Sequence, residues 1–134
     1  MNPKILFVDD EAQMRDLLSL YLQGNGMDVA LAGNIQQAKD LLEGTQFDLT
    51  ILDLNLAGED GLEVLHFIKT KWPKHPVIIF TGLSDDEVLI KKALAGRAEG
   101  FVRKMSGLTT VLATIRKLLP EIAASEAGQS TSGN

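Results

Sequence analysis

Cysteine is absent from the 134 residues of this chain. Its absence excludes disulfide bonds, thiol nucleophiles and cysteine-ligated metals, so any bound metal must use oxygen or histidine ligands. No apolar stretch approaches the length of a membrane span, and the short run Ile5–Val8 is followed too quickly by acidic residues to be part of a signal peptide. We therefore expect a cytoplasmic protein that has no membrane partner.

Basic residues are scarce in the first part of the chain. Residues 1–60 carry 3 Lys and Arg against 11 Asp and Glu, whereas residues 61–134 carry 10 against 7, and the formal net charge is −5. A nucleic-acid surface depends on Lys and Arg that neutralise phosphates, so direct nucleic-acid binding is not expected. The concentration of acid is compatible with a site that holds a cation.

Short apolar runs alternate with stretches that have the helical period of 3.6 residues. The first helical stripe is Met14, Leu17, Leu18, Tyr21 and Leu22. Another consists of Leu108, Val111, Leu112, Ile115, Leu118 and Leu119, and a weaker one of Ile35, Ala38, Leu41 and Leu42. Asn34 with Gln37, and Ser84 with Glu87, are placed as amino-terminal caps of helices. The expected strands are Ile5–Val8, Val29–Ala32, Leu49–Leu54, Val77–Phe80 and Phe101–Val102.

The strands with continuous apolar runs, such as Val77–Phe80, need cover on both faces, which is typical of parallel sheets between helices. With right-handed crossovers, the pattern predicts a doubly wound (βα)5 α/β fold, a flavodoxin-like three-layer sandwich with strand order 2-1-3-4-5. The length fits a single domain over residues 1–122. Residues 123–134 are rich in Ala, Ser, Gly and Thr, which predicts a flexible tail or the start of a linker.

Polar side chains follow four of the expected strands. The first strand is followed by Asp9 and Asp10, the third by Asp53, the fourth by Thr81 and the fifth by Lys104. Two carboxylates about 4 Å apart repel by roughly 4 kcal/mol at an effective dielectric constant near 20, so three of them together need a cation. Oxygen ligands without cysteine or a nearby histidine favour Mg²⁺.

A magnesium ion in this place would bring phosphate to the carboxylates. Asp53 lies on the expected central strand, where its carboxylate is best placed to attack a phosphorus atom. Thr81 could donate its hydroxyl to a phosphoryl oxygen, and Lys104 could neutralise another. Each of these residues alone is weak support, since Thr favours strands and a single Lys is usually a surface charge.

These residues resemble the receiver domains of two-component response regulators, the CheY-like superfamily, over roughly residues 3–120. Asp9, Asp10, Asp53, Thr81 and Lys104 occupy the five signature positions of that family. The resemblance implies that Asp53 takes a phosphoryl group from a phosphohistidine on a sensor histidine kinase or a histidine phosphotransfer protein. It also implies a phosphorelay protein that is a phosphoacceptor and not a turnover enzyme, with possible self-catalysed phosphorylation and autodephosphorylation.

The resemblance further implies that Mg²⁺ is bound by Asp10, Asp53 and the backbone carbonyl of Asn55, with Asp9 acting through water. Phe101 matches the aromatic residue that moves when the Thr81 hydroxyl turns toward the phosphoryl group. The surface that reads out this change would be the fourth helix, the fifth strand and the fifth helix. That surface would face an unknown downstream protein or output domain, or a second copy in a homodimer.

The chain departs from the family pattern at three positions. Ala57 and Met105 stand where proline is common, and Arg97 stands where a glycine is usual. These departures predict irregular loops around the site. They also leave open the alternative that the chain is a receiver-like interaction module that works without phosphate. The sequence contains no output domain, so the chain could be a stand-alone regulator or part of a longer one.

Two other functions would use the same architecture. A magnesium-dependent aspartyl-phosphate phosphatase needs a general acid two residues after its nucleophile, where this chain has Asn55. A flavin carrier needs hydroxyls and free amides after the first strand, where acids would repel its phosphate. His66 and His75 have no partner at ligand or catalytic spacing, and neither is assigned a function.

Overall fold

The computed structural model describes residues 2–82 and 87–119. Five strands alternate with five helices, and a small hairpin is inserted after the third strand. The elements of the sheet and its helices are β1 (Lys4–Val8), α1 (Ala12–Gln23), β2 (Asp28–Ala32), α2 (Ile35–Gly44), β3 (Leu49–Leu52), α3 (Leu62–Lys71), β6 (Val77–Thr81), α4 (Glu87–Ala95), β7 (Gly100–Arg103) and α5 (Leu108–Leu118). The hairpin consists of β4 (Asn55–Leu56) and β5 (Glu59–Asp60).

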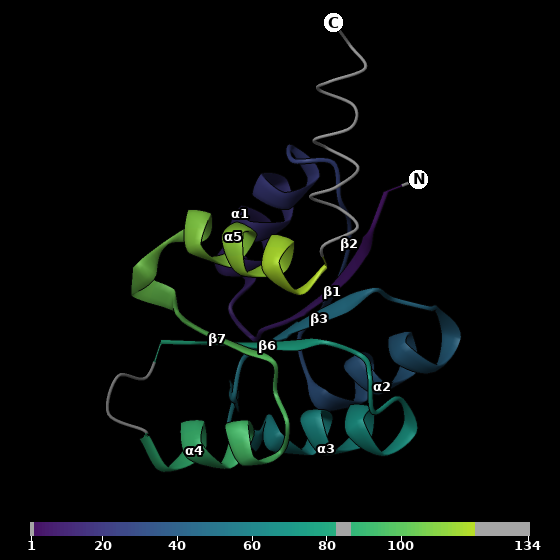
Figure 1. Ribbon diagram of the computed structural model, residues 1–134, viewed down its shortest axis with the longest axis vertical. Coiled ribbons are helices and arrows are strands. Elements are labelled where there is room, and N and C mark those ends of the chain that lie inside the picture. Colours follow the sequence, from purple (N-terminus) through teal and green to yellow (C-terminus); the bar gives the residue numbers. More distant parts are fainter. Residues whose placement is uncertain (1, 83–86, 120–134) are drawn as a thin grey trace, which may run out of the picture.

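All five main strands are parallel and lie in the order β2-β1-β3-β6-β7. This order confirms the predicted doubly wound fold, because the hairpin strands β4 and β5 form a separate sheet. Figure 1 shows α1 and α5 on one face of the sheet and α2, α3 and α4 on the other. No helix in the described ranges is long and apolar enough to cross a membrane.

Each face of the sheet carries its own apolar core. Side chains of α1 and α5, including Leu18 and Ile115, pack with Phe7 and Phe80 of the sheet. On the opposite face, buried side chains of α2, α3 and α4 pack against alternate residues of the same strands. The helical stripes predicted from the sequence are therefore the surfaces that cover the sheet, with the exception of Leu17 in α1, which is 54% exposed and lies outside this core.

The cap predicted for α2 is present, since Asn34 Oδ1 accepts a hydrogen bond of 2.8 Å from the Gln37 backbone amide. The cap predicted at Ser84 and the boundary after residue 122 lie outside the described residues, as does the whole tail over 123–134. The fourth strand ends one residue later than predicted, at Thr81.

The third strand ends at Leu52, two residues earlier than predicted. The chain then leaves the sheet and forms the hairpin of β4 and β5, which the sequence patterns did not indicate. Its two-residue turn, Ala57 and Gly58, has φ values of 53° and 88°. Proline fixes φ near −65°, so a proline at position 57 could not adopt this turn.

Arg97, in the loop after α4, also has a positive φ, of 73°. A side chain in this left-handed conformation costs about 1 kcal/mol, whereas glycine adopts it freely. We expect Arg97→Gly to raise the free energy of unfolding by about 0.5–1 kcal/mol in urea denaturation. Lys91→Gly, inside the exposed face of α4, serves as the control and should lower it by about 1 kcal/mol. A loss of stability in Arg97→Gly would contradict this reading of the loop.

Candidate acidic site at the carboxyl ends of the strands

Three aspartates come together where β1 and β3 end. Asp9 and Asp10 follow β1, and Asp53 follows β3, whose residue Leu52 is in register with Val8. One carboxylate oxygen from each aspartate lies within 4.8 Å of the others. Asp9 is fully buried and Asp53 is 4% exposed, while Asp10 is exposed. The site is therefore an acidic patch that is buried at Asp9 and Asp53 and open to solvent at Asp10.

Lys104, the first residue after β7, reaches across the sheet edge into this patch. Its ammonium lies 2.8 Å from Asp9 Oδ2, 2.9 Å from Asp53 Oδ2 and 2.7 Å from Glu11 Oε1. The lysine side chain is only 11% exposed. One cation thus compensates carboxylates that come from two different strand ends, although Asp10 has no contact with it in the structure.

Glu11 is a site residue that the sequence analysis missed. It occupies the N-cap position of α1, yet its side chain makes no capping bond and contacts Lys104 instead. The only signal in the sequence was a third consecutive acid, which is equally typical of a helix start. The role of Glu11 depends on its contact with Lys104, which no pattern in the sequence indicates.

Backbone groups fix the two buried carboxylates. Asp9 Oδ1 accepts a bond of 2.9 Å from the amide of Glu11, and Asp53 Oδ1 accepts one of 3.1 Å from the amide of Asn55. Arg15 of α1 donates to the carbonyl of Asp9 over 2.6 Å, which ties the helix to the loop that carries the aspartates. In both carboxylates one oxygen is held by the backbone, and the other faces Lys104.

Burial and charge shift the pKa values of these groups in opposite directions. Desolvation raises the pKa of Asp9 and of Asp53 above the ordinary value, even though the contacts with Lys104 and with backbone amides act to lower it. Burial alone would lower the pKa of Lys104, but its hydrogen bonds to Asp9, Glu11 and Asp53 outweigh this and raise it. The ammonium therefore stays charged, and the two buried carboxylates are only partly compensated.

The donor set fits a hard divalent cation. It consists of carboxylate oxygens alone, and the single ammonium of Lys104 faces both buried carboxylates, those of Asp9 and Asp53. Two buried carboxylates that share one cation gain from a further ligand that carries positive charge. Mg²⁺ takes one or two carboxylates and keeps several waters, which suits a patch that is open on the side of Asp10.

The other predicted site residues lie on the neighbouring strands. Thr81 ends β6 and is 2% exposed. Leu52 and Ile79 are the last pair of the adjacent strands β3 and β6, so Asp53 comes one residue and Thr81 two residues after that pair. Phe101 on β7 is half-buried against the core, with the Arg103 guanidinium 5.3 Å from its ring centroid. Asn55 is exposed at the start of the hairpin.

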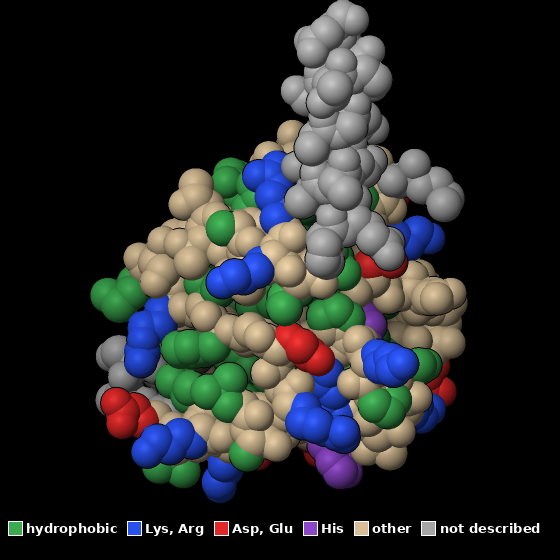
Figure 2. All heavy atoms as spheres, viewed as in Figure 1, with side chains coloured by type: hydrophobic (Ala, Val, Ile, Leu, Met, Phe, Trp, Pro, Cys, Tyr) green, Lys and Arg blue, Asp and Glu red, His purple; other side chains and the backbone are tan. Residues whose placement is uncertain are grey.

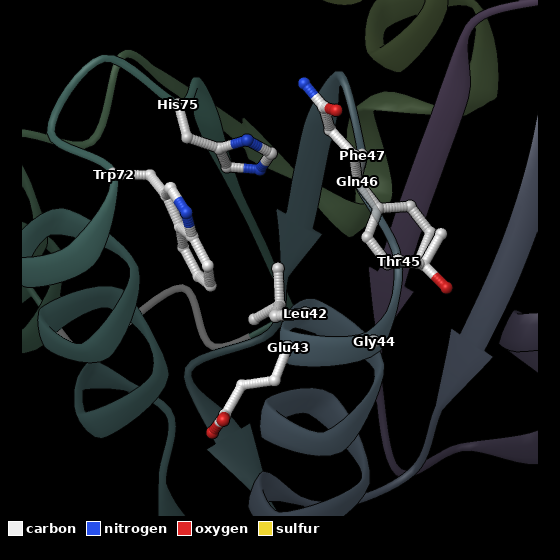
Figure 3. Close-up of a pocket in the computed structure, with 8 residues that line it drawn as sticks. All are labelled: Leu42, Glu43, Gly44, Thr45, Gln46, Phe47, Trp72 and His75. Atoms are coloured by element: carbon white, nitrogen blue, oxygen red, sulfur yellow. The ribbon is translucent and has the colours of Figure 1, made fainter.

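A cavity of about 420 Å³ lies elsewhere, beside the loops that lead into β3 and β6 at the amino ends of the strands. Figure 3 shows Trp72 and His75 on one side of it and Phe47 on the other. His75 Nε2 lies 2.8 Å from the hydroxyl of buried Thr50, and burial lowers the pKa of this histidine. The bond to Thr50 gives His75 a structural partner that the sequence did not show. None of the three aspartates Asp9, Asp10 and Asp53 lines the cavity.

Comparison with known proteins agrees with the parallel sheet and the acidic site at its edge. Residues 5–116 match the model of the response regulator receiver domain. The alginate biosynthesis transcriptional regulatory protein AlgB of Pseudomonas putida is 35% identical over 115 residues, which cover 86% of this chain and 26% of AlgB. Four curated relatives are each matched over 21% to 51% of their own length, so the chain spans only part of them.

Solved structures give the same result. The receiver domain of NtrX from Brucella abortus is 28% identical, with a TM-score of 0.81, and the match covers 87% of this chain and 98% of that one. The response regulator TrrA from Thermotoga maritima, solved in complex with Mg²⁺ and BeF, is 31% identical with a TM-score of 0.79, over 87% of this chain and 99% of that one.

Proposed function

Because the chain belongs to the family of response regulator receiver domains, we propose that Asp53 is its phosphoacceptor. The observation that carries the proposal is the placement of a nearly buried carboxylate, with one oxygen held by the backbone and the other facing Lys104, at the centre of an acidic patch. The donor would be a phosphohistidine of a sensor histidine kinase or of a histidine phosphotransfer protein. The exchange would take place in the cytoplasm.

In the proposed transfer, a carboxylate oxygen of Asp53 forms a bond to phosphorus as the P–N bond of the donor breaks. The leaving imidazole takes up a proton from water, and Asp53 becomes an acyl phosphate. Lys104 already contacts the Asp53 oxygen that would react, so its ammonium can neutralise charge on the phosphoryl group. This positioning by fixed charges is what phosphoryl transfer chiefly requires of a protein.

Asp10, Asp53 and the backbone carbonyl of Asn55 are the proposed ligands of Mg²⁺, with Asp9 acting through water. The bound ion would supply positive charge to the oxygens of the incoming phosphoryl group. Asp9 is fully buried and partly held by Lys104, which agrees with an indirect role. The exposure of Asp10 leaves room for the waters that Mg²⁺ retains.

The phosphoryl group would be sensed by Thr81 and Phe101, which belong to the neighbouring strands β6 and β7. We propose that the hydroxyl of Thr81 turns toward the phosphoryl group and that Phe101, which is only half-buried, follows it inward. The surface of α4, β7 and α5 would then change shape. It would contact a downstream protein, an output domain or a second copy of the chain.

The proposal is tested by treating the full chain with acetyl phosphate, with and without Mg²⁺. We expect one phosphoryl group per chain only when Mg²⁺ is present, labile to hydroxylamine and located at Asp53 by peptide mapping. Beryllofluoride with Mg²⁺ should shift amide resonances of β6, β7 and α4 in nuclear magnetic resonance spectra. If neither reagent modifies or shifts the protein, it is a receiver-like interaction module that works without phosphate. Sustained turnover of phosphate esters would instead indicate a phosphatase.

Replacing Asp10 with asparagine should weaken Mg²⁺ binding at least tenfold, because it removes one of the charged oxygens from the patch. Titration calorimetry measures the effect, with the fold monitored by circular dichroism. Asp16→Asn is the matched control, since Asp16 is also an exposed acid but lies on α1 outside the patch. Equal Mg²⁺ affinity in Asp10→Asn and in the unaltered protein would remove Asp10 from the ligand set.

A further inference from the structure

A groove between α3 and α4 has a basic rim and an apolar floor. It has a volume of about 390 Å³, and its floor includes half-buried Leu62 and buried Leu65, with exposed Ala95 beside them. Lys92, Arg97 and His66 also line it, and all three are exposed. Figure 2 shows Lys and Arg side chains over the lower part of the visible face, where Figure 1 places α3 and α4.

The positive charge of this rim is not used within the described part of the protein. Lys69 also lines the groove, but its buried ammonium is bound by both carboxylate oxygens of Glu99, at 2.8 Å and 2.6 Å. In the described ranges no ion pair or hydrogen bond engages the side chains of Lys92 and Arg97. Two cations and a histidine therefore remain at the rim of a protein whose net charge is −5.

The backbone at Arg97 supplies a separate observation. This residue stands in the left-handed region, with φ of 73°, where glycine would fit without strain. An arginine there places a guanidinium at the end of the groove at a cost to the fold. Strained non-glycine residues of this kind are concentrated at functional positions.

We propose that this groove binds an acidic protein segment that carries one or two apolar side chains. The carboxylates of the segment would pair with Lys92 and Arg97, and its apolar side chains would cover Leu62 and Leu65 on the floor. Charge complementarity selects this partner, because the exposed cations Lys92 and Arg97 at the rim attract carboxylates. Nucleic acid is a poorer match, since its affinity depends on a longer row of cations than this groove offers.

The test uses the full chain without Mg²⁺ or phosphoryl donor, so it is independent of the reaction at Asp53. The probe is a labelled peptide of four glutamates around two leucines. We expect saturable binding in fluorescence anisotropy, weakened at least tenfold when NaCl rises from 50 to 300 mM, with amide shifts confined to residues 62–70 and 92–97. A peptide with lysines in place of the glutamates should not bind.

Variants distinguish binding of the peptide in the groove from attraction by the positive charge of the surface in general. Lys92→Gln and Arg97→Gly should each weaken binding of the acidic peptide at least threefold, although Arg97→Gly removes strain and leaves the fold at least as stable. Lys91→Gln is the matched control, because Lys91 is an exposed neighbour of Lys92 that does not line the groove. Arg97→Lys should retain most of the affinity.

Three results would overturn the proposal. The first is the absence of binding by the glutamate and leucine peptide, or equal weakening by Lys91→Gln and Lys92→Gln. The second is tighter binding of a single-stranded oligonucleotide at the same residues, which would make the groove a nucleic-acid site. The third is a dimer in analytical ultracentrifugation that Lys92→Gln dissociates, which would make it an interface between copies of the chain.

Discussion

Asp53→Asn should abolish phosphorylation by acetyl phosphate and at the same time raise the free energy of unfolding by about 1 kcal/mol at pH 7. The loss follows from the proposed reaction, because an amide cannot form the acyl phosphate. The gain follows from burial, which raises the pKa of the Asp53 carboxyl and so opposes its charge in the folded protein. Asparagine has a similar shape and no charge to desolvate.

The dependence on pH distinguishes this explanation from a packing effect. Since the pKa of Asp53 is higher in the folded than in the unfolded protein, the folded state binds more protons, and the stability of the unaltered protein falls as pH rises through that interval. The penalty is complete above the raised pKa and disappears below the unfolded value, near 3.8. The advantage of Asp53→Asn should therefore vanish as pH falls toward 4.

Urea denaturation in EDTA measures the difference in unfolding free energy between Asp53→Asn and the unaltered protein at pH 7 and at pH 4. Asp16→Asn is the control, and it should change this free energy little at either pH. Adding Mg²⁺ should reduce the advantage of Asp53→Asn, because a bound cation stabilises only the protein that retains the carboxylate. Undiminished phosphorylation of Asp53→Asn would refute the assignment of the acceptor. A stability gain that is the same at pH 4 and pH 7 would refute its electrostatic origin.

Gly61→Ala should lower the free energy of unfolding by about 3 kcal/mol and slow phosphorylation of Asp53. A methyl group at this position would overlap the carbonyl oxygen of Asp53 and lie 2.8 Å from the Cα of Leu54. These are backbone atoms, which cannot move aside as a flexible side chain can. The loop that carries the acceptor must therefore shift.

The matched control is Gly44→Ala at the end of α2. An added methyl group there meets no atom within 4 Å, and its φ is not positive, so the alanine should be neutral or slightly stabilising. Urea denaturation gives the stability of both variants, and the rate of modification by acetyl phosphate reports on the acceptor. A change of less than about 0.5 kcal/mol in Gly61→Ala would show that the loop accommodates the methyl group.

Some site residues could be found from the sequence and others could not. Asp9 and Asp53 were predictable because each follows a strand with a clear apolar run, and parallel strands end at one edge of the sheet. Lys104 was predictable from the shorter run Phe101–Val102 together with the resemblance to receiver domains. Glu11 and Gly61 were not, since their importance depends on Lys104 and on the Asp53 backbone, which are distant in the sequence. The cations Lys92 and Arg97 are evident in the sequence as candidates for a docking surface, but the groove that they line depends on the packing of α3 against α4.

By itself, the sequence determined the five parallel strands, the helices that cover them and the edge at which the acids gather. Periodicity and burial are local properties that repeat along the chain, so a pattern of side chains is sufficient to specify them. The tertiary structure alone decided the hairpin after Asp53, the positive φ of Arg97 and the contacts of Lys104. The contacts of Lys104 depend on distances between segments that meet only after folding, and no spacing in the sequence records such distances. The hairpin and the loop at Arg97 are local, but Ala57 and Arg97 adopt positive φ values that their residue types do not favour, so their side-chain pattern does not indicate them.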